Sequence, residues 1–186
     1  MSILDNFIKI VDEIYGVYLD STAGFDTVRE SCIKLQKNLA VECSLSEEEI
    51  DKRSFTFGKG NPNKKGAYPL HVCSQGIFKK RNKKNGRNYR IIARLCLVMI
   101  YQYWEDYYRP RIAEENKVLK ENIKWDIIGD LRFFRESIIH HKGIAIPKIE
   151  NCKILKWFKE GEIININNRQ FEEIIRSIKT SKYEIC

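Results

Sequence analysis

The apolar residues of this 186-residue chain recur mostly three and four positions apart, which is the period of an amphipathic helix. A first stripe predicts a helix of about five turns near the N-terminus. Residues 21–24 are expected to end it, and a second helix is expected to follow. Ser46 and Glu49 have the spacing of a capping box that opens a short acidic turn. The inward positions of the two helices are Ile3, Leu4, Phe7, Ile8, Val11, Ile14, Tyr15 and Tyr18, and then Val28, Cys32, Leu35 and Leu39.

The middle of the chain has a different pattern. Residues 55–76 are rich in Gly, Asn and Lys, contain two of the four prolines, and predict an irregular loop. A long helix is expected to begin between residues 86 and 88 and to end near Tyr108, because Pro110 follows. We assign the aromatic residues near its end to the core and to an interface before any ligand. Its predicted inward stripe is Ile91, Leu95, Val98, Gln102 and Glu105.

A further amphipathic helix is predicted from about residue 123 to 141, with Gly143 as its C-terminal cap. At 100° per residue, its core stripe falls on Ile127, Leu131, Phe134, Ile138 and His141. His141 is therefore expected to be packed or to cap the helix, whereas its neighbour His140 is expected to be exposed.

The last forty residues are expected to be structural. A short helix is predicted around residues 154–158, and a brief extended segment at 161–166. Asn168 is expected to cap a final helix whose inward residues include Phe171 and Ile174. The predicted fold class is all-α: a helical bundle forming one domain over residues 1–186, with a long basic loop at 53–90 and a small C-terminal helical and extended appendage at 147–186.

Composition restricts the class of protein. Hydrophobic residues at 43% and charged residues at 31% are typical of a globular chain. No apolar run approaches the ~20 residues of a membrane span, and the N-terminus lacks the features of a secretion signal. Six cysteines lie far apart without a Cys-x-x-Cys pair, which favours free thiols in a reducing cytoplasm. We therefore expect a cytoplasmic protein that binds no membrane, metal or cofactor.

Charge is distributed unevenly along the chain. The net charge is +8, but residues 53–104 contain twelve Lys or Arg and no Asp or Glu. Such a run usually faces a polyanion, although a solvated lysine-rich loop is the plain alternative. RNA is preferred to DNA because no recognition helix is apparent. His71 is expected to anchor a loop, and Gly58-Lys-Gly60 lacks the pattern of a phosphate loop. The candidate RNA-binding residues are Lys79, Lys80, Arg81, Lys83, Lys84, Arg87 and Arg90.

The segment from Gly129 to Gly143 carries the candidate chemistry. Arg135 can hold a phosphate and His140 can move a proton, which are the minimum requirements for cleaving RNA without a metal. On a regular helix these two residues lie about 140° apart. Either the last turn unwinds, or a second copy of the helix supplies the missing partner in a twofold dimer.

The sequence Arg135-Glu-Ser-Ile-Ile-His140 resembles the Arg-x(4–6)-His motif of the HEPN superfamily of helical proteins. The flanking residues 129–132 and 140–143, and the aromatic stretch at 103–109, are also similar, so the resemblance covers roughly residues 86–145. It implies dimerisation through the motif helices and metal-independent RNA cleavage that leaves a 2′,3′-cyclic phosphate. It further implies that Arg135 contacts the scissile phosphate and that His140 transfers protons.

Glu136 departs from the Asn, Asp or His common at that position in the family. A carboxylate there can orient His140 from the next turn, or it can repel the substrate phosphate.

Two hypotheses for the function follow. The first is an endoribonuclease with Arg135, His140 and Glu136 at its centre, acting as a toxin or antiviral effector beside an antitoxin or another defence protein. The second is a catalytically silent HEPN-like module, in which Arg135 pairs with Glu136 or Asp130.

Overall fold

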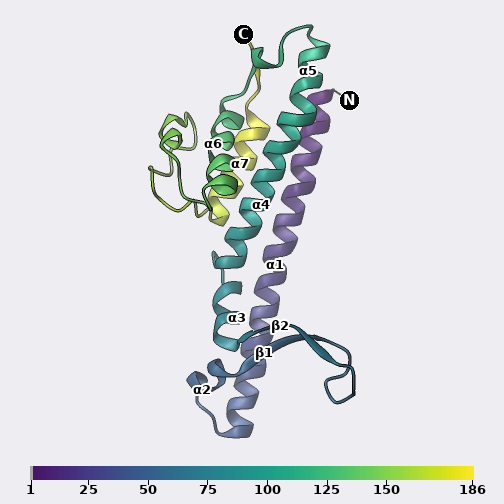
Figure 1. The fold of residues 1–186 in the computed structure, drawn as a ribbon, viewed down its shortest axis with the longest axis vertical. Coiled ribbons are helices and arrows are strands. Elements are labelled where there is room, and N and C mark those ends of the chain that lie inside the picture. The colour runs from purple at the N-terminus through teal and green to yellow at the C-terminus, as the bar shows by residue number, and fades with distance from the viewer. Residues whose placement is uncertain (1) are drawn as a thin grey trace. The chain divides into compact units, whose positions relative to one another are not determined.

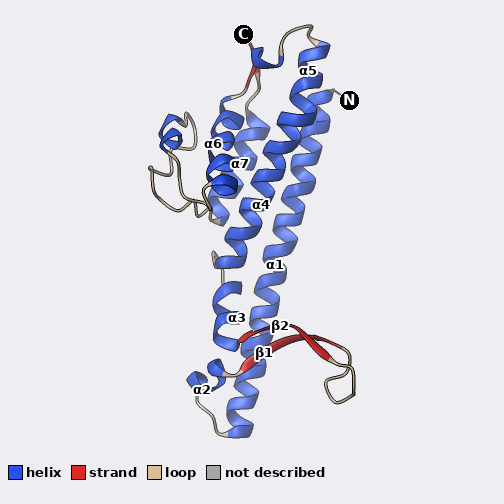
Figure 2. Ribbon diagram, viewed as in Figure 1, coloured by secondary structure: helices blue, strands red, loops and turns tan. Residues whose placement is uncertain are grey.

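The computed structural model describes residues 2–186, which are mostly helical (Figures 1 and 2). The helical class predicted from the sequence is therefore confirmed. The helices are α1 (Ile3–Cys43), α2 (Glu47–Lys52), α3 (Gln75–Asn82), α4 (Arg87–Tyr103), the π-helical η1 (Trp104–Tyr108), α5 (Arg109–Glu115), the 3-10 turn η2 (Lys120–Asn122), α6 (Asp126–His140), the 3-10 turn η3 (Pro147–Asn151) and α7 (Asn168–Thr180). The strands are β1 (Ser54–Lys59), β2 (Tyr68–Ser74), β3 (Ile123–Lys124) and β4 (Glu184–Ile185).

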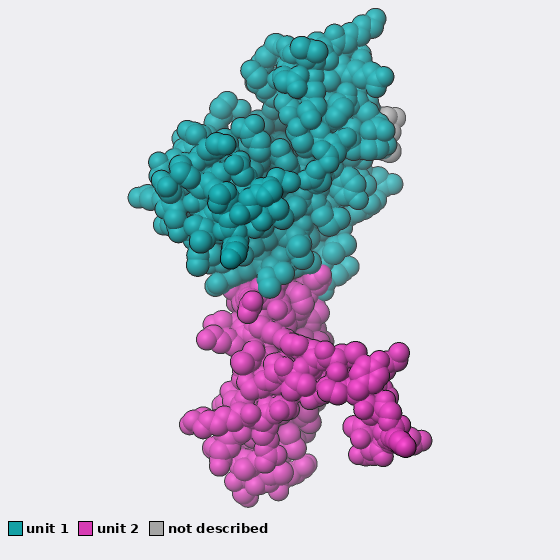
Figure 3. All heavy atoms as spheres, in the orientation of Figure 1, with its two compact units in different colours: residues 1–20, 90–186 teal, residues 21–89 magenta. Residues whose placement is uncertain are grey.

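The chain divides into two compact units, where the sequence predicts one domain (Figure 3). Unit 1 contains the residues up to Asp20 together with Arg90–Cys186, and unit 2 contains Ser21–Tyr89. The motif helix α6 belongs to unit 1. Most of the basic run belongs to unit 2.

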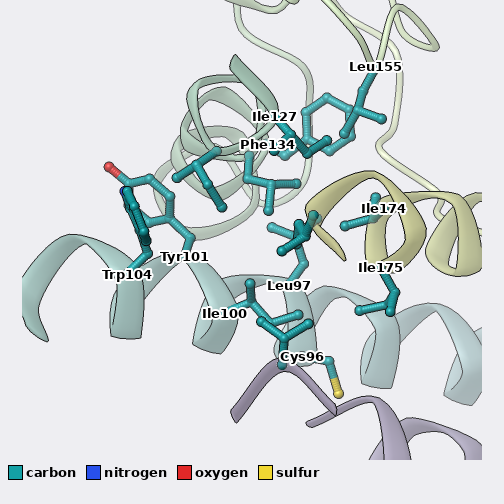
Figure 4. Packing of buried hydrophobic residues seen from close by; sticks show 14 of the residues in the cluster. Cys96, Leu97, Ile100, Tyr101, Trp104, Ile127, Phe134, Leu155, Ile174 and Ile175 are labelled. Carbon is teal, nitrogen blue, oxygen red and sulfur yellow. The ribbon is translucent and has the colours of Figure 1, made fainter. Parts of the chain in front are cut away.

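Unit 1 is held together by one apolar cluster to which α1, α4, α6 and α7 all contribute (Figure 4). The ring of Phe7 on α1 lies 5.2 Å from that of Trp104 and 6.0 Å from that of Trp125. Farther along α1, Tyr18 packs against Phe171 of α7 with ring centroids 4.3 Å apart. Aromatic pairs at these distances add to the free energy gained by burial alone. This core fixes the inner face of α6 and leaves its outer face for chemistry.

The predicted break at residues 21–24 is wrong, because α1 continues through it as a single helix. Gly24 costs roughly 1 kcal/mol of helix stability relative to alanine, which is too little to end a helix that is buried elsewhere along its length. Thr27 also stays within the helix by donating its hydroxyl hydrogen to the carbonyl oxygen of Ala23. Thr22 and Cys32 are buried. Packing therefore overrides the local turn signal.

The predicted basic loop over 53–90 is also wrong in its structure. Strands β1 and β2 form an antiparallel hairpin, and the basic residues between 79 and 90 lie on α3, on the turn that follows it and on the start of α4 (Figure 2). The ring of Phe55 on β1 stacks on that of Phe78 on α3 at 4.0 Å. Phe78 is buried, so a hydrophobic contact between residues 23 positions apart selects the strand. The irregular parts of this region are the connection between the two strands and the short turn at 83–86.

Helix α4 buries a different face from the predicted one. Ala93, Leu97 and Ile100 are fully buried, whereas Ile91 and Leu95 are exposed. The apolar residues nearly encircle this helix, so periodicity alone could not select the buried side. Pro110 does not end the helical run either. The π-helical turn η1 precedes it, and α5 carries the proline in its first turn, where a missing N–H group is tolerated.

The C-terminal segment has less helix than predicted. Residues 152–167 are irregular apart from a bridge between Ile144 and Ile163, so the expected helix at 154–158 is absent. The final helix is confirmed as α7, with Phe171 and Ile174 buried. Its cap is Asn167, one residue before the predicted one.

Among residues 2–186, no helix is long and apolar enough to cross a membrane. All six cysteines are free thiols. Burial raises the pKa of the Cys96 thiol to about 11.

Candidate functional site

The motif residues lie where α6 ends, and Ser137 organises this end. Its hydroxyl is buried, donates to the carbonyl oxygen of Phe133 and accepts the backbone N–H of Ile146. Its carbonyl oxygen accepts the backbone N–H groups of His141 and Gly143, at 3.1 and 2.9 Å. Ser137 therefore links the last turn of α6 to the segment that follows it.

Gly143 closes the helix as predicted, with a φ of +82°. A Cβ atom at this position would lie 3.0 Å from the guanidinium carbon of Arg94. Arg94 in turn donates from Nε to the carbonyl oxygen of Ile164 at 2.8 Å and from Nη2 to the side chain of Asn165 at 3.3 Å. Glycine is therefore required both by the backbone conformation and by the close approach of Arg94.

Arg135 and His140 converge within one chain. Nη1 of Arg135 lies 3.0 Å from Nε2 of His140. The inference that the two residues cannot meet without an unwound turn or a second copy is therefore wrong: His140 is still helical, and the long arginine side chain reaches around the helix to it. A guanidinium group can only donate, so in a hydrogen bond between the two groups Nε2 of His140 is the acceptor.

His141 was predicted either to pack or to cap the helix, and the capping role is confirmed: it occupies the C-cap position, and its carbonyl oxygen accepts the N–H of Ile144 at 2.9 Å. Its side chain is exposed and does not pack in the core. His140, His141 and Lys142 together line an open hollow of about 360 Å³. Sequence reasoning missed His141 and Lys142, although the glycine stop at residue 143 implied that both lie at or beyond the helix end. The hollow beside the motif pair is large enough for part of a nucleotide.

Glu136 and Asp130 have partners other than those expected. The carboxylate of Glu136 lies 3.5 Å from Nζ of Lys148, which places it away from the predicted role of orienting His140. Asp130 is buried, and its two oxygens accept backbone N–H groups from residues 153–155. The silent-module hypothesis paired Arg135 with one of these acids. Neither pairing occurs, and the partner of Arg135 is His140.

The predicted RNA-binding residues divide into two groups. Lys79 is only 13% exposed in its side chain and is bound to Asp51 at 2.7 Å and to Glu47 at 3.0 Å. Burial alone would lower the pKa of Lys79, but the hydrogen bonds and charges of these two carboxylates outweigh it and raise the pKa. Lys79 is thus a structural residue of unit 2.

Arg81 contacts a histidine in the same unit. Its Nη1 lies 2.7 Å from Nε2 of His71, and its guanidinium carbon lies 5.3 Å from the centre of the Phe78 ring. His71 therefore anchors local structure, as predicted, but it does so from strand β2 and not from a loop. The exposed members of the predicted set are Lys80, Lys83, Lys84, Arg87 and Arg90.

Unit 2 has fourteen Lys or Arg against seven Asp or Glu, so it carries +7 of the net charge of +8. Nearly all of the excess positive charge thus belongs to one unit. Residues 2–186 contain no group of three or more His, Cys, Asp or Glu that could hold a metal ion.

Comparisons with protein-family models, with curated proteins and with solved structures found no match for this chain. A functional assignment therefore depends on the geometry and chemistry of the residues themselves.

Proposed function

We propose that this protein is a metal-independent endoribonuclease of the HEPN type, with Arg135 and His140 at its catalytic centre. The observation that carries the proposal is the contact of 3.0 Å between the guanidinium group and the imidazole, beside an open hollow. The pair combines a fixed positive charge with an imidazole, a group that can transfer protons. These are the two groups that phosphodiester cleavage by a neighbouring hydroxyl requires.

In the proposed reaction, the scissile phosphate replaces His140 as the hydrogen-bond acceptor of Arg135. Nε2 of His140, now free, takes the proton of the ribose 2′-hydroxyl. The 2′ oxygen then bonds to phosphorus and the bond from phosphorus to the 5′ oxygen breaks, leaving a 2′,3′-cyclic phosphate. The departing 5′ oxygen takes a proton from a second imidazole. His141 in the same hollow is one source, and His140 of a second copy is the other.

A chemical test follows from this route. Wild-type protein in EDTA is expected to cut RNA and to leave cyclic phosphate ends, because the 2′ oxygen is the nucleophile. A DNA strand with one ribonucleotide is expected to be cut only after that nucleotide. Cleavage of an all-deoxy strand, or ends that carry no cyclic phosphate, would contradict the proposed reaction.

Unit 2 is proposed to bind the RNA backbone through its exposed basic residues. Replacing Lys80, Lys83, Lys84 and Arg87 together with alanine should lower the slope of log affinity against log salt by roughly 3, since each phosphate contact on a single strand contributes about 0.7. Filter binding over a salt series measures the slope. Lys79→Ala is the control: it removes one positive charge from a residue already bound to carboxylates, and RNA affinity should stay within about twofold. An unchanged slope in the quadruple variant would contradict this role.

A homodimer through the motif region is also proposed. Three isoleucines in unit 1, at 139, 144 and 163, are 49%, 48% and 58% exposed, and Ile144 lines the hollow beside His140. Ile144 pairs with Ile163 in an isolated β-bridge, and Ile139 precedes His140 in α6. Exposed apolar side chains next to a site are typical of a contact surface.

The double variant Ile139→Glu/Ile163→Glu is expected to sediment as a monomer at micromolar concentration, where the wild type sediments as a dimer. Ile185→Glu changes a similarly exposed isoleucine on β4 and should leave the dimer intact. A monomeric wild type with full cleavage activity would show that no dimer is needed.

A further inference from the structure

A separate cavity in unit 1 is lined by η1 and the first half of α6. Its volume is about 480 Å³. Tyr101, Trp104 and Trp125 line it and are only 8%, 2% and 5% exposed, so its inner wall is aromatic and buried. Arg132 and Lys124 line it too and are exposed. A largely apolar cavity with a few charged groups at its mouth is the usual form of a small-ligand site.

Gly129 keeps part of this cavity open. It lies within α6 and lines the cavity, and a Cβ atom placed on it would meet no atom within 4 Å. Glycine lowers helix stability relative to alanine, and this position has neither a positive φ nor a close neighbour to require it. The residue at this position therefore sets how much space the cavity offers.

Charged residues of both signs line the cavity: four Lys or Arg, at 109, 124, 132 and 153, and four Asp or Glu, at 105, 121, 126 and 130. Burial raises the pKa of the Tyr101 hydroxyl, and the charge of Glu105 acts in the same direction, whereas the positive charges of Arg132, Arg135 and Arg109 oppose it. Figure 4 shows the oxygen of Tyr101 directed away from the aliphatic part of the core.

Only one of these three arginines is neutralised. Arg109 is bound to Glu105 at 2.9 Å and to the carbonyl oxygen of Ile123 at 3.0 Å. Within residues 2–186, Arg132 and Arg135 form no ion pair with a carboxylate; Arg132 lies over the ring of Phe133 at 5.0 Å. Arg132 lines the cavity, whereas Arg135 does not. An aromatic cavity with one guanidinium group that no carboxylate binds fits a flat base that carries a phosphate.

We propose that this cavity is a nucleotide subsite, in which a base of the RNA stacks against the aromatic wall and Arg132 binds its phosphate. Along α6, Arg135 lies about 9 Å from Gly129 and Arg132 about 4.5 Å from it, so the subsite leads along the helix toward the motif pair. The inference deepens the proposed nuclease function, since the bound nucleotide would neighbour the scissile phosphate. Binding of a base in this subsite does not require RNA cleavage, so the two can be measured separately.

Titration with adenosine 3′-monophosphate tests the subsite directly, using the tryptophan fluorescence of Trp104 and Trp125 as the signal. The wild type should show saturable quenching. Gly129→Leu fills the cavity and should weaken binding at least tenfold, whereas Gly129→Ala adds one carbon to open space and should bind within about twofold of the wild type. Arg132→Ala should weaken binding of the nucleotide but leave binding of adenosine unchanged.

Absence of saturable quenching in the wild type, or equal affinity in Gly129→Leu, would overturn the subsite. Arg132 is exposed, so its variant remains informative if Gly129→Leu does not fold. His140→Ala separates the two proposals, because it should lose cleavage and still bind the nucleotide. Nucleotide binding by a wild type that cleaves no RNA would support the subsite and contradict the nuclease. Unchanged cleavage by a folded Gly129→Leu would support the nuclease and contradict the subsite.

Discussion

Asp130→Asn is expected to destabilise unit 1 by about 3 kcal/mol, the largest single effect on stability that we predict. The buried carboxylate accepts the N–H groups of Lys153, Ile154 and Leu155 at 2.8, 2.7 and 2.8 Å. An asparagine turns an NH₂ donor toward at least one of these donors, which leaves a buried amide without an acceptor. Cys152 is affected too, because burial raises the pKa of its thiol to about 12 and the negative charge of Asp130 acts in the same direction.

Thermal unfolding followed by tryptophan fluorescence measures this effect, because all three tryptophans lie in unit 1. A loss of 3 kcal/mol corresponds to a fall in Tm of roughly 6–12 °C. Asp126→Asn is the matched control: this residue begins the same helix and pairs with Lys153, but its side chain is 53% exposed. It should cost less than about 1 kcal/mol. Equal shifts in the two variants would contradict the role assigned to Asp130.

His140→Ala is expected to slow RNA cleavage about 10² to 10⁴-fold, because the base that takes the 2′ proton is removed. Arg135→Ala should cost about 10² to 10³-fold through the lost stabilisation of the phosphate. Neither variant should change Tm appreciably, since their contact lies at the surface. Arg135→Lys keeps the charge but loses the forked donor geometry, and its rate should fall between those of the wild type and Arg135→Ala.

Arg176→Ala serves as a matched control for these variants, since it removes an exposed arginine from another helix of unit 1 and should leave the rate unchanged. His141→Ala identifies the proton donor. A loss as large as that in His140→Ala would assign the donor to His141, and a small loss would assign it to His140 of a second copy. Rates that fall together with Tm in the motif variants would indicate a structural role instead.

The sequence predicted the fold best where a helix buries one clear face. Helices α6 and α7 were placed within three residues of their ends, because their apolar stripes and their cap signals agree. The helix predicted at residues 154–158 is absent for a reason that lies outside the local sequence. Asp130 on α6, 24 residues before Ile154, accepts backbone N–H groups of this segment. The β1–β2 hairpin was not predicted for a similar reason, because a contact between Phe55 and Phe78 favours it.

The sequence likewise predicted only part of the candidate site. Residue type and spacing singled out Arg135 and His140, and the glycine stop at residue 143 located the helix end. Their convergence could not be derived from backbone angles alone, because it depends on the path of a long side chain. The structural role of Lys79 was hidden for a different reason. Its partner Asp51 precedes it by 28 residues, so composition alone grouped it with the solvated lysines.

The most direct measurement is the cleavage of a mixed RNA in EDTA by the wild type, beside Arg135→Ala and His140→Ala. The proposed function predicts cleavage by the wild type and its loss in both variants, with RNA binding retained in all three. Binding without cleavage by the wild type would contradict the catalytic claim and favour a silent RNA-binding module. Glu136 would then be the first residue to replace, with asparagine, one of the residues common at this position in active HEPN proteins.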